Sequence, residues 1–277
     1  MKIDINPSII PTKDLHQYII GAVSPRPIAF VSTKDENGRN NLAPYSFFNA
    51  FSSNPPILVF SSNRKVSDNT TKDTLHNVEI NGECVVNVVP YAILRQMSLA
   101  SVEFPSGVSE FEKVGLTPEK SETVQCPRVA ESPINLECKV QDIITLGEHG
   151  GAGHLIICEV THIAIQESVL DNGRIDPRKL DLMGRMGRNW YVRVNGDALL
   201  ELHQNVTDVP LGFDRLPLHI LRSHILSGND LGALAALANV KIPLYDIPNQ
   251  NVEVHIKAKS MIKEGKAFEA LELLMST

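Results

Sequence analysis

The fold of this chain is decided by two neighbouring stretches near its start, Pro25-Arg-Pro-Ile-Ala-Phe-Val-Ser-Thr33 and Asn40-Asn-Leu-Ala-Pro-Tyr-Ser-Phe-Phe-Asn-Ala-Phe-Ser-Ser-Asn-Pro-Pro-Ile-Leu-Val-Phe-Ser-Ser62. Their outer ends, residues 28–32 and 57–60, are short apolar runs rich in β-branched and aromatic side chains, which predict strands. Residues 35–38 predict a hairpin turn. Residues 43–56 follow neither the strand period nor the helix period, although they contain three phenylalanines. We therefore expect an irregular segment that offers hydrogen-bond donors, hydroxyls and apolar faces to a flat, polar-edged cofactor.

The segments that follow predict a mainly β domain with short inserted helices. Strands are expected at residues 83–89, 134–146 and 154–165. Helices are expected at 11–18, capped by Thr12, at 71–82, starting at Thr71 and ending at Gly82, and at 91–100. Residues 105–133 are expected to run over the surface. Because hairpins join most of the strands, the pattern favours an antiparallel barrel over a doubly wound sheet.

The C-terminal part has a different character. Residues 213–226, 230–238 and 263–275 carry Leu, Ile and Ala at helical spacing, so we expect a barrel domain over residues 1–204 and a helical extension over 205–277. The helix expected at 230–238 is apolar nearly all round and must be buried. We expect it to pack on another subunit or on the barrel of its own chain.

Composition excludes several classes of protein. The chain has 277 residues, of which 43% are hydrophobic, enough for one sizeable core and an accessory region. Its net charge is −6, with no run of Lys or Arg, which argues against nucleic-acid binding. The chain starts without a signal-peptide pattern and has no apolar run near the roughly 20 residues that span a bilayer, so we expect a cytoplasmic protein without a membrane partner.

Most motifs for catalysis or metal binding are missing. The four cysteines are widely spaced, which signals neither a zinc site nor a redox dithiol, and Cys84, Cys138 and Cys158 are expected to be buried thiols. Hydrolase motifs are absent, and the glycine-rich loop at residues 147–153 precedes a strand, unlike a dinucleotide-binding loop. We assign no catalytic residue and no metal ligand.

Two short elements together predict a phosphate site. Ser61, Ser62 and Arg64 end a strand, and Lys72 and Thr74 begin a helix a short loop later. A helix N-terminus offers free N–H groups, and an arginine can bind two phosphate oxygens at once. The alternative is a capped helix with exposed charges, which Asp73 in the first turn would suit.

These residues carry a resemblance to a known family. Residues 24–33, 40–48 and 53–56 and the triplet Lys72-Asp-Thr74 resemble the flavin-reductase-like proteins with an FMN-binding split barrel, in the branch of flavoredoxin and the reductase component of nitrilotriacetate-type monooxygenases. The resemblance covers roughly residues 15–195. It implies a homodimer of six-stranded antiparallel Greek-key barrels, with FMN bound near the subunit interface.

The same resemblance implies which residues hold the cofactor. Those expected along the isoalloxazine ring are Asn41, Ala43, Pro44, Tyr45, Ser46 and Phe47. Those expected around the phosphate are Ser61, Ser62, Arg64, Lys72, Asp73 and Thr74. Arg26 and Ser32 are weaker candidates.

A further family segment falls at residues 182–191. It usually reads Arg-x-Gly-Gly-x-x-Tyr, and here Arg188 stands where the second glycine is expected. Trp190 and Tyr191 either cover the flavin or are ordinary interface aromatics.

The resemblance implies hydride transfer from NADH or NADPH to FMN, a reaction whose hard chemistry belongs to the cofactor. The implied function is an NAD(P)H:flavin oxidoreductase, the reductase component of a two-component monooxygenase. One alternative is a flavoredoxin-like electron carrier reduced by a protein partner. Another is a flavin-free interaction protein on the same barrel. The sequence does not distinguish NADH from NADPH.

Overall fold

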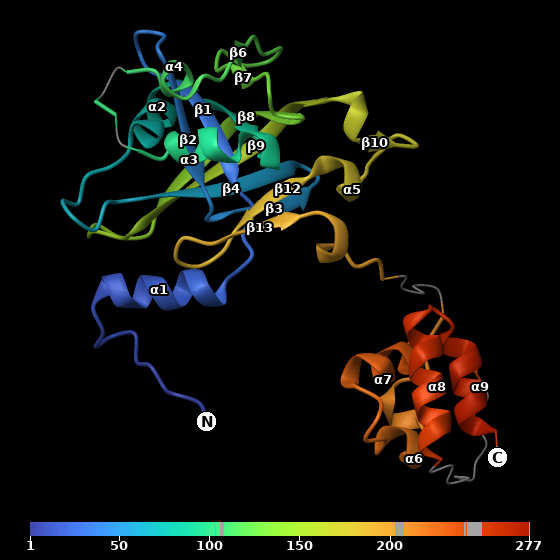
Figure 1. Ribbon diagram of the computed structural model, residues 1–277. Helices are drawn as coiled ribbons and strands as arrows, with labels where there is room; N and C mark the ends of the chain where they lie inside the picture. Colours follow the sequence, from blue (N-terminus) through green and yellow to red (C-terminus); the bar gives the residue numbers. More distant parts are fainter. Residues whose placement is uncertain (103, 106–107, 203–207, 241, 243–250, 277) are drawn as a thin grey trace. The chain divides into compact units, whose positions relative to one another are not determined.

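The computed structural model describes residues 1–102, 104–105, 108–202, 208–240, 242 and 251–276. The chain divides into two compact units, Met1–Leu200 and Glu201–Thr277, each of which is described by itself (Figure 1). The predicted boundary between residues 204 and 205 lies outside the described residues. No helix in the described ranges is both long and apolar enough to cross a membrane.

The first unit is built on an antiparallel sheet in the order β2-β1-β5-β8-β9-β4-β3. Its strands are β1 (Ala29–Lys34), β2 (Asn40–Tyr45), β3 (Phe48–Ser53), β4 (Pro56–Asn63), β5 (Glu83–Asn87), β8 (Ile134–Thr145) and β9 (Gly153–Ile165). A mainly β, antiparallel fold is therefore confirmed, but this sheet has seven strands, not the six expected.

The sheet is also not closed by pairing of its end strands in the described residues. β2 and β3 stand at opposite ends of the strand order, although two residues, Ser46 and Phe47, connect them in the chain. The Ser61 N–H donates to the Phe47 carbonyl at 2.8 Å. This contact holds the connection against the end of β4, so the sheet curls back on itself without a continuous ladder.

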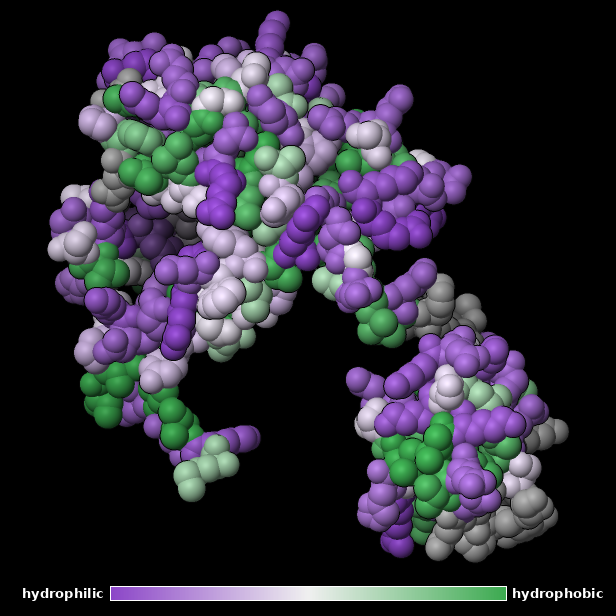
Figure 2. All heavy atoms as spheres, in the orientation of Figure 1, coloured by the Kyte–Doolittle hydropathy of each residue, from purple (hydrophilic) through white to green (hydrophobic). Residues whose placement is uncertain are grey.

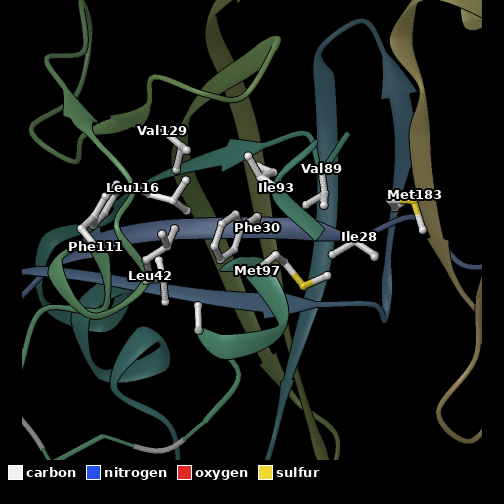
Figure 3. Close-up of a cluster of buried hydrophobic side chains, with 12 residues drawn as sticks. Ile28, Phe30, Leu42, Val89, Ile93, Met97, Phe111, Leu116, Val129 and Met183 are labelled. Carbon is white, nitrogen blue, oxygen red and sulfur yellow. The ribbon is translucent and has the colours of Figure 1, made fainter. Parts of the chain in front are cut away.

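Strand β1 is buried on both faces because its side chains alternate between two cores. Phe30 enters a cluster with Leu42, Met97 and Phe111, and Figure 3 shows it in the middle of that cluster. Ala29 and Val31 enter a second cluster on the other face of the sheet. The predicted hairpin after β1 is confirmed, because Asp35 N–H donates to the Arg39 carbonyl at 3.0 Å.

The expectation of an irregular segment at residues 43–56 is wrong for most of its length, because residues 43–45 belong to β2 and residue 56 begins β4. Residues 48–53 form β3, an edge strand that pairs with β4. Its side chains are mostly exposed, including Phe51 at 68%. An exposed edge strand has no buried face to impose an alternating pattern, which is why the sequence did not reveal it.

The expected helices form close to their predicted positions. They are α1 (Thr12–Ala22), α2 (Asp73–Asn81), the 3₁₀ turn η1 (Tyr91–Ile93) and α3 (Leu94–Leu99). The N-cap of α1 is Pro11, so the expected cap Thr12 is instead the first helical residue. The N-cap of α2 is Lys72 instead of Thr71, and α2 ends at Gly82 in the left-handed conformation, with φ of 65°. α2, α3 and α4 (Glu110–Val114) lie beside β1 and β2 (Figure 1).

The expected surface excursion at 105–133 is wrong in its described part, because the chain there returns to the core. Phe111 and Val129 are almost fully buried, and the segment adds α4, β6 (Pro118–Glu119) and β7 (Arg128–Val129). The rest of the first unit contains η2 (Glu167–Val169), β10 (Leu170–Asp171), β11 (Arg174–Ile175), α5 (Pro177–Leu180), β12 (Leu182–Arg185), β13 (Tyr191–Val194) and η3 (Gly196–Ala198). The expected burial of Cys84, Cys138 and Cys158 is confirmed. Hydrophilic side chains cover much of the visible surface (Figure 2).

The second unit is helical, as expected. Its elements are η4 (Phe213–Arg215), α6 (Leu218–Leu221), α7 (Gly228–Ala235), α8 (Val252–Lys263) and α9 (Ala267–Met275). The buried residues of α7 lie in a core shared with α8 and α9. The buried side chains of the apolar helix expected at 230–238, here α7, therefore pack inside their own unit. Packing of this helix on a second subunit or on the barrel stays a prediction.

Candidate functional site

A cavity of about 250 Å³ lies between β2, the start of α2 and the segment that carries α3 and α4. It brings together six of the predicted cofactor residues, Asn41, Ala43, Pro44, Lys72, Asp73 and Thr74. Residues that the sequence did not predict complete the wall: Lys65, Thr71, Ala100, Ser101, Val102, Phe104 and Glu110.

The N-terminus of α2 forms one side of this cavity. Lys72 occupies the N-cap position, but no side chain makes a capping hydrogen bond to the start of the helix. The first N–H groups of a helix have no partner within it, and the helix dipole makes this end positive. Asp73 lies in the first turn without making the capping bond that would explain it as an ordinary cap. This end of α2 is suited to an anionic group.

Hydrogen bonds join the polar residues of the opposite side into one network. Asn41 Oδ1 accepts from Thr74 Oγ1 at 2.9 Å and from Thr33 Oγ1 at 3.1 Å. Asn41 Nδ2 and Leu42 N–H donate to the same oxygen of Glu110, at 3.1 and 2.9 Å. Burial raises the pKa of the Glu110 carboxyl, although the Leu42 N–H opposes that shift.

Three predicted residues carry buried polar atoms that have no hydrogen-bond partner in the described part of the chain. They are Tyr45 Oη, Ser62 Oγ and Arg64 Nε. Burial raises the pKa of Tyr45 to about 12, against the influence of the neighbouring Thr74 and Ser62 side chains. Lys72 Nζ stands 5.2 Å from the centre of the Tyr45 ring. Tyr45 Oη nevertheless lies within reach of the Thr74 and Ser62 hydroxyls, and none of the three residues lines the cavity of Asn41 and Lys72. Because buried polar atoms are nearly always satisfied in native proteins, these atoms are open to a further partner such as a ligand or water.

Other predicted residues face different surroundings. The Arg26 guanidinium donates to the carbonyls of Ile20 and Val23 and, through Nε, to Ser46 Oγ at 3.3 Å. It also stands 5.9 Å from the centre of the Phe47 ring. Arg26 thus fastens α1 to the segment that joins β2 and β3.

Two serines bond within the protein. Ser61 Oγ bonds to Asn63 Oδ1 at 2.8 Å, and Ser32 Oγ donates to the Pro127 carbonyl.

Trp190 and Tyr191 line a separate, open cavity of about 810 Å³ between α1 and residues 186–192. The Trp190 side chain is 72% exposed. Arg188 has φ of 53°, a left-handed conformation that suits the glycine expected at this position. Neither aromatic residue belongs to the cavity of Asn41 and Lys72.

Among the wall residues that sequence reasoning missed, Glu110 is the one that bonds to Asn41. It follows Asn41 by 69 positions, in a segment without clear periodicity. The start of the short helix at Ser109-Glu-Phe was its one local signal. The described residues contain no group of His, Cys, Asp and Glu that could hold a metal ion.

Comparison with known proteins decides the family. The model of the flavin reductase like domain matches residues 21–181, more than half of the chain. The chain belongs to the flavin reductase like family. The match contains the cavity described above but neither Trp190 nor Tyr191, nor the second unit.

Relatives and solved structures agree with this flavin reductase like assignment. An uncharacterized protein of Aquifex aeolicus is 40% identical over 190 residues, which are 68% of this chain and 94% of the relative. Nitrilotriacetate monooxygenase component B of Bacillus cereus has a TM-score of 0.68 and 32% identity, covering 73% of this chain and 99% of that one. The 2-nitrobenzoate 2-nitroreductase of Pseudomonas fluorescens has a TM-score of 0.67 and 29% identity, over 76% and 100%. A split-barrel flavin reductase of Shewanella frigidimarina, at 24% identity and a TM-score of 0.62, shares the fold.

Proposed function

We propose that this protein binds FMN and acts as an NAD(P)H:flavin oxidoreductase. The observation that carries the proposal is the cavity that Asn41, Ala43 and Lys72 line at a helix end that no side chain caps. The buried Nε of Arg64, just after β4, has no hydrogen-bond partner in the described residues and adds to it. FMN has a phosphate and many hydrogen-bonding atoms, so the residues present fit it. Family membership supports the same cofactor class.

We assign the phosphate end to the start of α2 and the end of β4. Arg64 and the first N–H groups of α2 would bind phosphate oxygens, and Ser62 would donate its hydroxyl. Lys72 adds positive charge near the Tyr45 ring. The segment from Ala43 to Phe47 would lie along the ring system.

Bound FMN would supply the hydride-accepting chemistry, and the protein would bind and orient the two partners. No side chain of the chain is needed as acid or base for this role. The ring-binding segment must hold the cofactor still and keep one face open to the nicotinamide.

We further propose that the protein works as a homodimer and serves as the reductase component of a two-component monooxygenase. The likeness to the Bacillus cereus component B supports the second statement. Two exposed apolar side chains, Phe51 of the edge strand β3 at 68% and Leu146 just after β8 at 61%, line a cavity of about 390 Å³ and support the first. Light scattering after size-exclusion chromatography measures the mass that decides it.

Anaerobic addition of NADH or NADPH to the FMN-loaded protein tests the proposed reaction. We expect rapid bleaching of the flavin absorbance without any other protein. Bleaching that needs a reduced protein partner would instead identify an electron carrier like flavoredoxin. Absence of flavin binding would contradict both functions.

A further inference from the structure

The protein fixes which atoms donate and which accept in the hydrogen bonds around Asn41. A carboxylate only accepts hydrogen bonds, so the Asn41 amide nitrogen must face Glu110 and its oxygen must face the two threonines. Each threonine hydroxyl has one hydrogen. Thr33 accepts from Asn77 Nδ2 at 2.9 Å and donates to Asn41.

This arrangement limits what the predicted phosphate residue Thr74 can donate to a ligand. Its hydroxyl hydrogen is committed to Asn41 Oδ1, and its side chain is almost fully buried. What Thr74 can donate to an anion is therefore its main-chain N–H, at the start of α2. The position of that N–H depends on how α2 is fastened to β2.

We infer that Glu110 is a positioning residue for the phosphate end of the cofactor site, acting through Asn41 on the first turn of α2. The inference rests on the proposed function. One oxygen of Glu110 bonds both the main chain and the side chain of β2 at neighbouring residues, and Asn41 passes the constraint to Thr74. Glu110 thereby fixes the position of the start of α2 relative to β2, although no main-chain pairing joins these two elements.

Two features set this carboxylate apart from an ordinary core residue. It is 8% exposed and also borders the cavity, at the start of the five-residue α4. Burying a carboxylate costs free energy unless it is hydrogen-bonded, and the Glu110 carboxylate accepts from two groups of β2, Asn41 Nδ2 and Leu42 N–H. The second carboxylate on the wall, Asp73, faces the same cavity but makes no bond in this network.

The test compares Glu110→Ala with Glu110→Gln, and with Glu112→Ala as a matched control on the exposed side of α4. Gln keeps an acceptor oxygen for Leu42 N–H and Asn41 Nδ2, whereas Ala removes it. Affinities for FMN and riboflavin are measured for each protein. We expect Glu110→Ala to weaken FMN binding by about tenfold, with a smaller loss for riboflavin, and the other two variants to stay within about twofold.

Several outcomes overturn the inference. Unchanged FMN affinity in Glu110→Ala does so, as do equal losses for FMN and riboflavin, or a failure of Gln to restore binding. A wild-type protein that binds neither flavin would contradict the proposed function itself, which separates the two failures.

If the Glu110→Ala variant fails to fold, a measurement on the unliganded wild-type protein still tests the inference. The side-chain amide signals of Asn41 in ¹⁵N NMR should shift as Glu110 titrates, with a midpoint above the ordinary glutamate value, and should exchange slowly with solvent. Amide signals that exchange rapidly and ignore that titration would overturn the inference.

Discussion

Ser62 carries a buried hydroxyl that has no hydrogen-bond partner among the described residues. A group of this kind costs about 1–3 kcal/mol relative to a satisfied one, so its presence needs a reason. The reason offered here is a ligand that accepts its hydrogen. Arg64 Nε calls for the same explanation.

Ser62→Ala separates stability from binding. Removing the orphaned hydroxyl should leave the free energy of unfolding of the flavin-free protein unchanged or raise it, while FMN binding weakens by about 1 kcal/mol. Chemical denaturation and FMN titration measure the two quantities. A variant that loses stability but keeps its FMN affinity would mean that the hydroxyl serves the protein and not the ligand.

Arg64→Ala tests the phosphate contact. FMN binding should weaken by about 1.5–3 kcal/mol, because a charge-assisted bond is lost, whereas riboflavin binding should barely change. Arg64 also donates to the Asn69 carbonyl at 3.1 Å, so the melting temperature is measured in parallel. The exposed Arg174→Ala serves as the control for loss of one positive charge. Equal losses for both flavins would point to a structural role.

At the scale of elements, strands that bury apolar side chains were predictable and the exposed edge strand was not. β1 is buried along most of its length and β4, β8 and β9 each bury several residues, whereas the edge strand β3 lacks a buried face. Helix α8 was missed because Val252, Val254, Ile256 and Ala258 alternate with polar residues, which is the period of a strand. Packing in the helical unit overrides that local pattern.

The same scale explains which parts of the site could be predicted. Residues 41–47 and 61–74 lie close to each other in the sequence and carry local motifs, so they were predicted together. Glu110 belongs to a segment far from Asn41 in the sequence, and only the folded chain brings the two together. Local residue spacing therefore could not predict it. Trp190 was predicted by position in a motif, and the structure places it at a different cavity.

The segment that carries β6 and β7 is fastened by the buried Glu137 of β8. Its carboxylate accepts from Glu122 N–H at 2.9 Å, Thr123 N–H at 2.6 Å and Arg128 Nε at 2.7 Å. Burial alone would raise the pKa of Glu137, but these bonds outweigh it and lower the pKa to about 2.

This arrangement predicts an acid-sensitive stability. Because the folded pKa lies below the unfolded one, the contribution of Glu137 is complete above an ordinary glutamate pKa and is lost as the pH falls towards about 2. Glu137→Gln should lose about 3 kcal/mol at neutral pH and show a flatter decline in acid. Unfolding free energies from about pH 6 to about pH 3 test this. Parallel curves for the variant and wild type would contradict it, and Glu112→Gln is the exposed control.

At the scale of the whole molecule, the two units have separate cores. All the residues proposed to hold FMN lie in Met1–Leu200, and the helices of Glu201–Thr277 bury their apolar faces on one another. The family match likewise ends before the second unit.

Truncation after Leu200 should therefore leave a folded protein whose FMN affinity is within about threefold of the full chain. Circular dichroism and FMN titration of the two proteins measure this. A truncated protein that folds but loses FMN would show that the second unit contributes to the site.

The most direct test of the central claim is titration of the purified, flavin-free protein with FMN, followed by quenching of flavin fluorescence, with riboflavin as the comparison. We expect saturable binding near one FMN per chain. The affinity for FMN should be about tenfold or more above that for riboflavin, because the phosphate adds charge-assisted bonds. No saturable binding, or equal affinity for the two flavins, would contradict it.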